Sequence, residues 1–210
     1  MLLRLIANWK LNGSIESNKQ WAEEFFKNFS SSNFKSIGIA PASLHIDHFR
    51  KVLGGCGIEI GAQNICDEEF GARTGEISAS MIKDLGCKFS IIGHSERRIL
   101  FNESNKMISK KLNQANSNSV IPILCIGESV EENKKNDTYD VLEIQINEAF
   151  KGIDELSSLI IAYEPVWAIG SGKIPDPEEI NSVHKMIKDV VQSRFPKIDL
   201  KSVLYGGSVN

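Results

Sequence analysis

The segment LIIAYEPVWAIGSGK, residues 159–173, decides how the chain is expected to fold. Its first five residues are apolar and favour β structure, which is typical of a parallel strand covered on both faces. Glu164 follows at the C-terminal tip of this strand, and Pro165 fixes the backbone directly after it. Gly170 and Gly172 then allow a ligand to approach the main chain closely. The segment therefore predicts a buried strand that presents a carboxylate and is followed by a lid.

Three other interpretations of this segment compete with a catalytic strand end. A strand that ends in an ordinary glycine-rich surface turn would have the same composition. A Walker phosphate loop requires a glycine and a Ser or Thr where the chain has Trp167 and Ile174, so it is excluded. A dinucleotide fingerprint requires a third glycine where Pro175 stands, and it is excluded too. On this segment alone, the surface turn and the catalytic carboxylate both stay open.

Composition places the chain among ordinary globular proteins, with 210 residues, 41% hydrophobic and 24% charged residues and a formal net charge of −3. No apolar run approaches the roughly 18 residues of a membrane span, and the lysines are scattered, so we expect neither membrane nor nucleic acid as a partner. The N-terminus lacks the pattern of a secretory signal, which predicts a cytoplasmic protein. The cysteines show no CxxC spacing, which indicates reduced thiols. They are Cys56, Cys66, Cys87 and Cys125.

Short β-type runs alternate with amphipathic helical stretches along the whole chain. This alternation is typical of repeated βα units around a parallel sheet, and it predicts an α/β fold. No Pro- or Ser-rich linker interrupts it, so we expect a single domain over residues 1–210. The predicted strands are residues 2–7, 36–40, 58–62, 89–93, 121–126, 159–163 and 202–205.

Polar residues gather where the predicted strands end. Asn8 and Lys10 follow the first strand, His94 and Glu96 follow the fourth, and Glu164 follows the sixth. In a barrel of parallel strands these ends meet on one face, where such folds carry their chemistry. Each residue also has a plainer interpretation, because lysines are usually solvated and a histidine before Ser-Glu is more often a helix cap. The gathering as a whole favours an active site.

His45 and His48 stand three residues apart and resemble half of a metal site. No third ligand lies near them in the sequence. We therefore interpret them as surface residues and predict no metal site.

Seven motifs, in matching order and spacing, make the chain similar to the triosephosphate isomerase family. They are ANWKLN at 7–12, GAQN at 61–64, GARTGEIS at 71–78, IIGHSERR at 91–98, CIGES at 125–129, AYEPVWAIGSGK at 162–173 and YGGSV at 205–209. The resemblance implies an eightfold βα barrel, or TIM barrel, that is normally a homodimer. It also implies interconversion of dihydroxyacetone phosphate and glyceraldehyde 3-phosphate, in glycolysis and gluconeogenesis, without cofactor or metal.

The sequence departs from the family pattern at two positions and in its extent. Ala7 stands where glycine is common, and the far end of the lid reads Lys173-Ile174-Pro175. Residue 210 follows the seventh predicted strand closely, whereas such barrels typically need about 250 residues. We therefore expect a TIM barrel truncated to seven strands, which lacks the eighth loop that binds phosphate in the family.

The resemblance implies roles for the residues at matching positions. Glu164 would be the base that removes a proton from a substrate carbon. His94 would polarise the carbonyl and move protons between the two oxygens. Lys10 would supply positive charge to the substrate, and Asn8 would donate a hydrogen bond to it. Glu96 would support these groups from behind.

Phosphate binding, closure and association are implied in the same way. Gly170 and Ser208 would bind the substrate phosphate through backbone N–H groups, and Cys125, like Glu96, would support the catalytic groups from behind. Thr74, in a long loop without periodicity, would contact the partner subunit of a homodimer. The lid would comprise Pro165, Val166, Trp167, Ala168, Ile169, Gly170, Ser171, Gly172 and Lys173.

Two other classes stay open beside the isomerase. A Schiff-base aldolase on a similar barrel needs a lysine within a strand, and none of the predicted strands carries one there. A barrel that lacks its eighth strand could also be an inactive or weakly active fragment. Turnover of triose phosphate distinguishes these alternatives.

Overall fold

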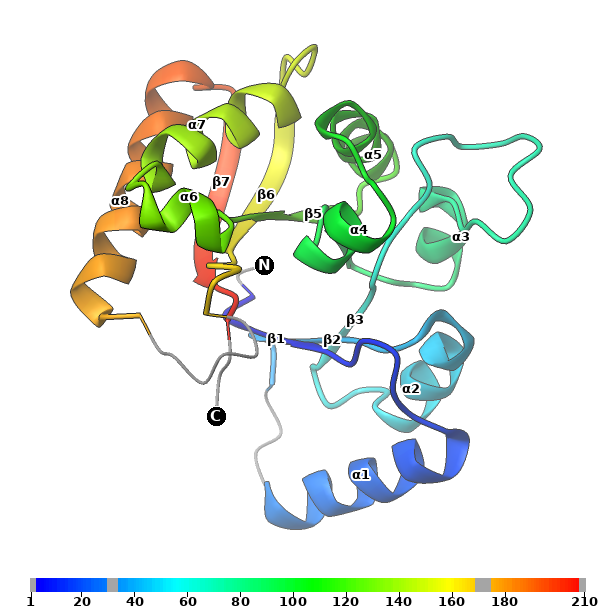
Figure 1. Cartoon of the computed structure of the whole chain (residues 1–210). Coiled ribbons are helices and arrows are strands. Elements are labelled where there is room, and N and C mark those ends of the chain that lie inside the picture. The colour runs from blue at the N-terminus through cyan, green and yellow to red at the C-terminus, as the bar shows by residue number, and fades with distance from the viewer. Residues whose placement is uncertain (1–2, 30–33, 169–174, 208–210) are drawn as a thin grey trace.

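The structure is a computed structural model of the chain, and it describes residues 3–29, 34–168 and 175–207. A parallel sheet curls through its centre, each strand pairing with the next in sequence order, and helices lie on its outer side (Figure 1). The strands are β1 (Leu5–Asn8), β2 (Ile37–Ala40), β3 (Glu59–Ala62), β4 (Phe89–Ile92), β5 (Ile121–Ile126), β6 (Leu156–Tyr163) and β7 (Ile198–Tyr205). The prediction of an α/β barrel with seven parallel strands is therefore confirmed.

Two strands begin earlier than the sequence indicates. β6 begins at Leu156, and its pairing with β7 is irregular around the exposed Ser157. β7 begins at Ile198, and the exposed Asp199 and Lys201 follow. The polar residues hide these strand starts in the sequence, because they face solvent and interrupt the apolar pattern.

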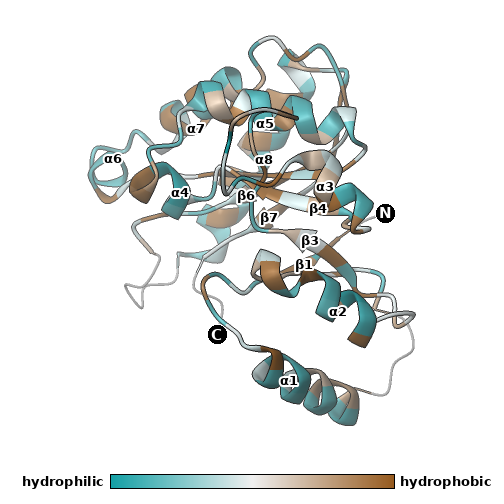
Figure 2. Cartoon of the chain, turned by 90° about the vertical axis from the view of Figure 1, so that its right-hand side faces the viewer, coloured by the Kyte–Doolittle hydropathy of each residue, from teal (hydrophilic) through white to brown (hydrophobic). Residues whose placement is uncertain are grey.

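The helices cover the outer face of the sheet. Figure 2 shows that α1 and α5 carry both hydrophilic and hydrophobic residues, as expected of helices with one buried face. Ile108, Leu112 and Ala115 of α5 are fully buried, and so are Leu142 and Ile146 of α7. The helices are α1 (Ile15–Asn28), α2 (Ile46–Val52), α3 (Ala79–Asp84), α4 (Ser95–Leu100), α5 (Asn105–Ser117), α6 (Val130–Lys134), α7 (Thr138–Ala149), α8 (Pro177–Arg194) and the short 3-10 helix η1 (Ser43–His45).

The inner face of the sheet is filled around the ring of Phe89, which is fully buried. A Cβ atom on Gly38 would lie 2.7 Å from this ring, and one on Gly61 would lie 2.4 Å from it. Both glycines lie on the neighbouring strands β2 and β3, so the missing side chains make room for the ring. This packing fixes the spacing of β2, β3 and β4 below the strand ends.

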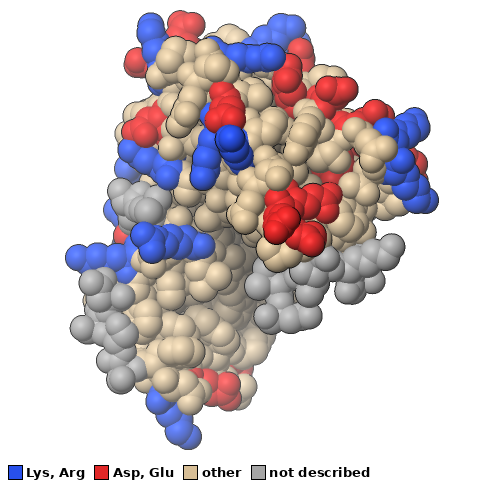
Figure 3. All heavy atoms as spheres, turned by 90° about the vertical axis from the view of Figure 1, so that its left-hand side faces the viewer, with Lys and Arg blue, Asp and Glu red and all other residues tan. Residues whose placement is uncertain are grey.

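The two margins of the sheet are β1 and β7, which do not pair with each other within the described residues. A hollow of about 410 Å³ lies at this seam, lined by Arg4, Lys188, Gln192 and residues 200–204. Figure 3 views the molecule from the side of α8 and shows a hollow on this face, with lysine and arginine side chains beside it. The barrel is therefore curled but open.

Candidate active site

Glu164 follows β6 directly and is only 5% exposed. Its backbone N–H donates to the Ile126 carbonyl at 2.7 Å, which extends the pairing of β5 and β6 by one residue. Its Oε2 atom accepts a hydrogen bond from the Ser95 backbone N–H at 3.0 Å, and Oε1 lies 3.5 Å from His94 Nε2. A buried carboxylate requires such donors, because burial without partners is costly. The strand end thus holds Glu164 against the start of α4.

His94 is the N-cap residue of α4. Its ring atom Nδ1 accepts a hydrogen bond from the Glu96 backbone N–H at 3.2 Å. A ring nitrogen that accepts carries no proton, so the neutral ring carries its proton on Nε2. That N–H group is on the side of the ring that faces Glu164. The cap interpretation and the catalytic interpretation of this histidine are therefore compatible.

Lys10 follows β1 with a backbone φ of 50°, a left-handed conformation that is uncommon for a residue other than glycine. Two amide side chains support this backbone. Asn8 Oδ1 accepts from the Lys10 N–H at 3.0 Å, and Gln63 Nε2 donates to the carbonyls of Lys10 and Ala40 at 2.9 and 3.0 Å. The turn that carries Lys10 is thereby tied to β2 and β3.

Glu96 links Lys10 to His94, which follows β4. Its Nζ lies 2.6 Å from Glu96 Oε1, while Glu96 Oε2 lies 3.7 Å from His94 Nδ1. Lys10 and Glu96 are partly exposed, whereas His94 and Glu164 are more deeply buried. The structure thus brings together four of the residues that the sequence singles out, in the order Lys10, Glu96, His94 and Glu164.

Cys125 lies in β5, is 2% exposed, and donates its thiol hydrogen to Glu164. Burial raises the pKa of this thiol well above its ordinary value, and the neighbouring Glu164 carboxylate raises it further. The thiol therefore stays protonated at neutral pH, and it is a hydrogen-bond donor rather than a nucleophile.

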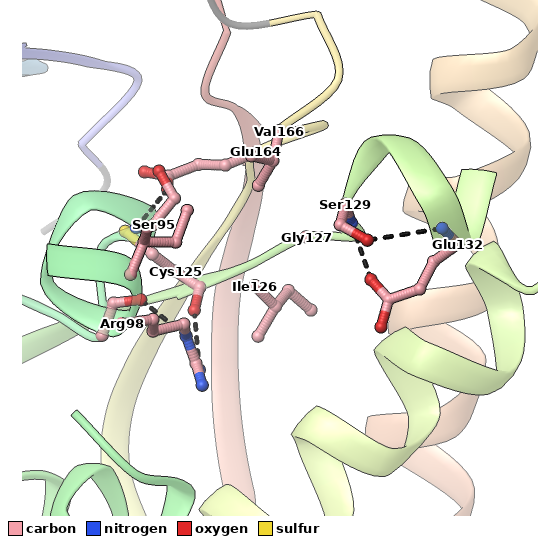
Figure 4. A pocket seen from close by; sticks show the side chains of 11 residues that line it. Ser95, Arg98, Cys125, Ile126, Gly127, Ser129, Glu132, Glu164 and Val166 are labelled. Atoms are coloured by element: carbon pink, nitrogen blue, oxygen red, sulfur yellow. Dashed lines mark hydrogen bonds between the residues drawn. The ribbon is translucent and has the colours of Figure 1, made fainter. Parts of the chain in front are cut away.

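A cavity of about 110 Å³ lies beside the Glu164 carboxylate (Figure 4). Glu164 and Ser95 form its upper edge in this view, Arg98 and Cys125 lie below them, and Ser129 pairs with Glu132 on the far side. The cavity is lined by Gly93, Ser95, Arg98, Ile99, Cys125, Ile126, Gly127, Ser129, Glu132, Glu164 and Val166.

Glu128, which the sequence interpretation did not select, is the fully buried carboxylate beneath the start of the predicted lid. Its Oε1 atom accepts hydrogen bonds from Trp167 Nε1 at 2.7 Å and from the Tyr163 hydroxyl at 3.1 Å. Burial raises the pKa of Tyr163, and Glu128 raises it further. The Glu128 carbonyl accepts from the Val166 N–H at 3.1 Å. The sequence does contain one signal for Glu128, because the residue follows the fifth predicted strand, 121–126, at a position where the other strands carry functional side chains.

The remaining predicted residues belong to phosphate binding, the lid and the subunit contact, and only some of them lie within the described ranges. Gly170 and Ser208 lie outside the described residues, as do lid residues 169–173. Pro165 and Ala168 are described and buried. Thr74 lies in the described loop between β3 and α3 and is exposed. Its contact with a partner subunit stays a prediction.

The structure bears on the expectation that His45 and His48 are surface residues and form no metal site. His45 and His48 are half-buried rather than on the surface, and each has a buried ring nitrogen without a hydrogen-bond partner. Within the described ranges, no group of three or more His, Cys, Asp or Glu side chains could hold a metal ion.

The expectation that no strand carries a lysine, as a Schiff-base aldolase would need, is wrong for β7. Lys201 lies within this strand, because β7 begins earlier than predicted. Its side chain pairs with Asp199, toward the end of the strand opposite Glu164. In the described part of the chain, no helix is long and apolar enough to cross a membrane.

Parallel strands that are followed by Glu164, His94 and Lys10 define a βα barrel that gathers a carboxylate, an imidazole and an ammonium group at the carboxyl ends of its strands. The family model described as triosephosphate isomerase matches residues 3–210, and the chain belongs to this family.

Curated relatives carry the same name. The triosephosphate isomerase of Aquifex aeolicus (strain VF5) is 42% identical over 210 residues, which cover 99% of this chain and 85% of the relative. That of Nitrosococcus oceani is 38% identical over 208 residues, covering 98% and 83%. That of Buchnera aphidicola subsp. Schizaphis graminum is 42% identical over 214 residues, covering 98% and 82%.

Proposed function

We propose that the chain is a triosephosphate isomerase, which interconverts dihydroxyacetone phosphate and D-glyceraldehyde 3-phosphate in glycolysis and gluconeogenesis. One observation carries the proposal beyond family membership. The Glu164 carboxylate and the proton-bearing Nε2 of His94 lie 3.5 Å apart at the ends of two strands. A base and an acid that close can act on neighbouring atoms of one small substrate.

Glu164 is the base in this reaction. Its carboxylate removes a proton from the carbon next to the substrate carbonyl, which leaves an enediolate. Returning the proton to the neighbouring carbon completes the exchange of ketone and aldehyde. The bond to the Ser95 N–H fixes the direction of the carboxylate, whose Oε1 atom faces His94.

His94 donates from Nε2 to the carbonyl oxygen where negative charge develops. The Glu96 N–H supports this role, because its bond to Nδ1 keeps the proton on Nε2. A neutral ring can therefore give a proton to one oxygen and take one from the other.

Lys10 and Asn8 complete the electrostatics. The Lys10 ammonium group lies 2.6 Å from Glu96 and is partly exposed. It can therefore leave Glu96 and form an ion pair with an anionic substrate. The strained turn supports this role by directing the side chain from the end of β1 toward the fourth strand end. Asn8 uses its Oδ1 to hold that turn, which leaves its amide nitrogen as a donor. Such fixed positive groups stabilise developing negative charge.

Phosphate binding and closure are proposed for residues that lie partly outside the described ranges, namely 169–173 and 208. Backbone N–H groups at Gly170 and Ser208 would bind the phosphate, and residues 165–173 would close over the site. Glu128 supports this proposal at the near end of the lid, because it anchors Trp167 and the Val166 backbone. A lid requires one fixed end.

We also propose a cytoplasmic homodimer without cofactor. Large apolar side chains are exposed in the segments that follow β1, β2 and β3, namely Leu11 (97%), Leu44 (90%) and Phe70 (83%). The ends of parallel strands lie on one side of the barrel, so these residues gather there with Thr74. Exposed apolar residues that gather favour an interface. Thr74→Arg is expected to weaken the dimer by forcing a charge into it, and sedimentation of the two proteins measures this. A fully active monomer would contradict the dimer.

Turnover of triose phosphate tests the proposed function directly. The purified 210-residue protein is supplied with glyceraldehyde 3-phosphate, and the appearance of dihydroxyacetone phosphate is followed with a coupled dehydrogenase. We expect conversion without added metal, also in the presence of a chelator. A folded protein that converts no substrate would favour the alternative of an inactive, incomplete barrel, and release of two shorter carbonyl compounds from a longer sugar phosphate would favour an aldolase.

A further inference from the structure

Arg98 lies on α4 and reaches back into the wall of the cavity beside Glu164 (Figure 4). Its guanidinium group donates three hydrogen bonds. Nε donates to the Gly93 carbonyl at 2.8 Å, Nη2 to the Cys125 carbonyl at 3.2 Å, and Nη1 to Asn105 Oδ1 at 2.7 Å. Arg98 therefore joins the end of β4, the end of β5 and the first residue of α5.

The Gly93 and Cys125 carbonyls lie where the pairing of β4 and β5 stops. The last residue pair of this ladder is Ile92 with Leu124. The Gly93 and Cys125 carbonyls lie beyond it, so the backbone of the neighbouring strand offers them no ladder hydrogen bond between β4 and β5. Ile126, the next residue of β5, directs its carbonyl to Glu164 on the β6 side. Because carbonyls alternate in direction along a strand, the Cys125 carbonyl faces β4. Arg98 supplies the donors that the backbone cannot supply there.

Gly93 has a left-handed backbone, with φ at 70°. A Cβ atom at this position would lie 2.8 Å from Ile108 Cδ1 and 3.2 Å from Arg98 Nη2. The guanidinium group therefore packs against the turn from which His94 leaves the strand. A planar group with five N–H donors in fixed directions suits this position, because it can bond to two carbonyls at once.

Each carbonyl belongs to a residue next to the proposed acid–base pair. Gly93 directly precedes His94, and the Cys125 thiol donates to Glu164. We propose that Arg98 is a positioning residue, which sets the distance between His94 and Glu164 by holding the ends of their supporting strands. This inference rests on the proposed isomerase function. Burial lowers the pKa of Arg98, whereas Cys125, Glu164 and Glu103 raise it, and a guanidinium group stays charged at neutral pH.

Two substitutions separate geometry from charge. Arg98→Ala removes all three donors and leaves a space, and Arg98→Lys keeps the charge but cannot reach three acceptors in a plane. We expect kcat of Arg98→Ala to fall by about 10²-fold, the loss that a displacement of about 1 Å produces. KM should change by less than about threefold, because the phosphate contacts are made elsewhere. Arg98→Lys should have a kcat less than about tenfold above that of Arg98→Ala, which is less than half of the 10²-fold loss on a logarithmic scale.

Guanidinium ion provides a readout that a merely structural role would not give. Added at millimolar concentration to Arg98→Ala, it should raise kcat several-fold by occupying the space of the side chain, whereas sodium ion at equal ionic strength should not. The matched control is Arg97→Ala on the same helix. The Arg97 side chain pairs with Glu103 at 2.5 Å and lies over the Phe101 ring, and within the described residues it makes no hydrogen bond to a strand end. This variant should lose thermal stability, keep kcat within about threefold, and show no rescue.

The outcomes separate this inference from the function on which it rests. If the wild type isomerises triose phosphate and Arg98→Ala does so with unchanged kcat, the positioning role is wrong and the function stands. If the wild type does not turn over, the function fails, and amide hydrogen exchange then decides the positioning role. The Ser95 and Glu96 N–H groups should exchange faster in Arg98→Ala than in Arg97→Ala. Equal exchange in the two variants would overturn the inference, and Arg98→Lys takes the place of Arg98→Ala if the alanine variant does not fold.

Discussion

Cys125 and Cys87 show how burial sets the chemistry of single residues. Cys125 keeps its proton beside Glu164 and serves as a donor, and Cys87, two residues before β4, is 1% exposed. Burial raises the pKa of Cys87 from 9.0 to about 11, and the charge of Arg50 opposes this rise only in part. Both thiols are therefore unreactive groups in the folded protein at neutral pH.

The raised pKa of Cys87 predicts how stability depends on pH. Between pH 9.0 and about 11, the unfolded chain loses this proton while the folded chain keeps it. The free energy of unfolding should therefore fall as pH rises through this window, by up to about 1.4 kcal/mol per pH unit from this thiol. Urea unfolding of the wild type and of Cys87→Ala at pH 8 and 10.5 measures the effect. The difference between the two proteins should change with pH, and a constant difference would rule the effect out.

At the scale of elements, burial on both faces decides which strands a sequence reveals. Residues 159–163 form one apolar run, because both faces of β6 are covered there, and the prediction was correct for that part. The first residues of β6 and β7 were missed because solvent-facing serine, aspartate and lysine interrupt the pattern. The helices around Ile108 and Ile146 followed from apolar spacing alone.

The candidate site was predictable only as a set of strand ends. Parallel pairing brings Glu164, His94 and Lys10 to one face, and their types indicate acid–base chemistry. Glu128 and Arg98 were missed as contributors, because their roles depend on distant partners. Glu128 needs Trp167 above it, and Arg98 bonds to carbonyls of two different strands. Backbone carbonyls and cavities have no signature in the sequence.

The packing of Phe89 against β3 predicts the effect of one added methyl group. Gly61→Ala would place Cβ 2.4 Å from the ring, so the strands must move apart. Overpacking of this kind typically costs about 1–3 kcal/mol in stability. Combining it with Phe89→Leu should recover part of that cost, because the smaller side chain leaves room. Urea unfolding of the two single variants and the double variant gives the coupling, and purely additive effects would contradict the packing account.

At the scale of the whole molecule, the open seam between β1 and β7 distinguishes the described structure from a closed barrel. The two strands leave backbone groups without ladder partners at the margins, beside the hollow of about 410 Å³. The turn that carries Lys10 follows one of these margins. The geometry of Lys10 therefore depends on a strand that, among the described residues, pairs with β2 alone.

Supplying an eighth strand should stabilise both the fold and the site. We expect that a helix and strand from a complete eight-stranded relative, fused after residue 210, raise Tm by about 2–4 °C for each kcal/mol gained. Backbone N–H groups of β1 should become protected from hydrogen exchange, because they would gain strand partners. Calorimetry and exchange measurements compare the fusion with a fusion of scrambled sequence. Equal Tm and equal protection of β1 in the two fusions would mean that the seam does not limit stability.

The proposed role of Glu164 is to transfer protons between adjacent carbons of a triose phosphate. In D2O, the wild-type protein should replace the transferred substrate hydrogen with deuterium, which proton NMR follows directly. Glu164→Gln keeps the shape and loses the basicity, so exchange should slow by about 10²–10⁴-fold or more, while binding of inorganic phosphate stays nearly unchanged. Glu143→Gln, which alters an ion pair with Arg194 on the outer helices, is the control and should exchange at the wild-type rate. Exchange at the wild-type rate in Glu164→Gln would show that Glu164 is not the base.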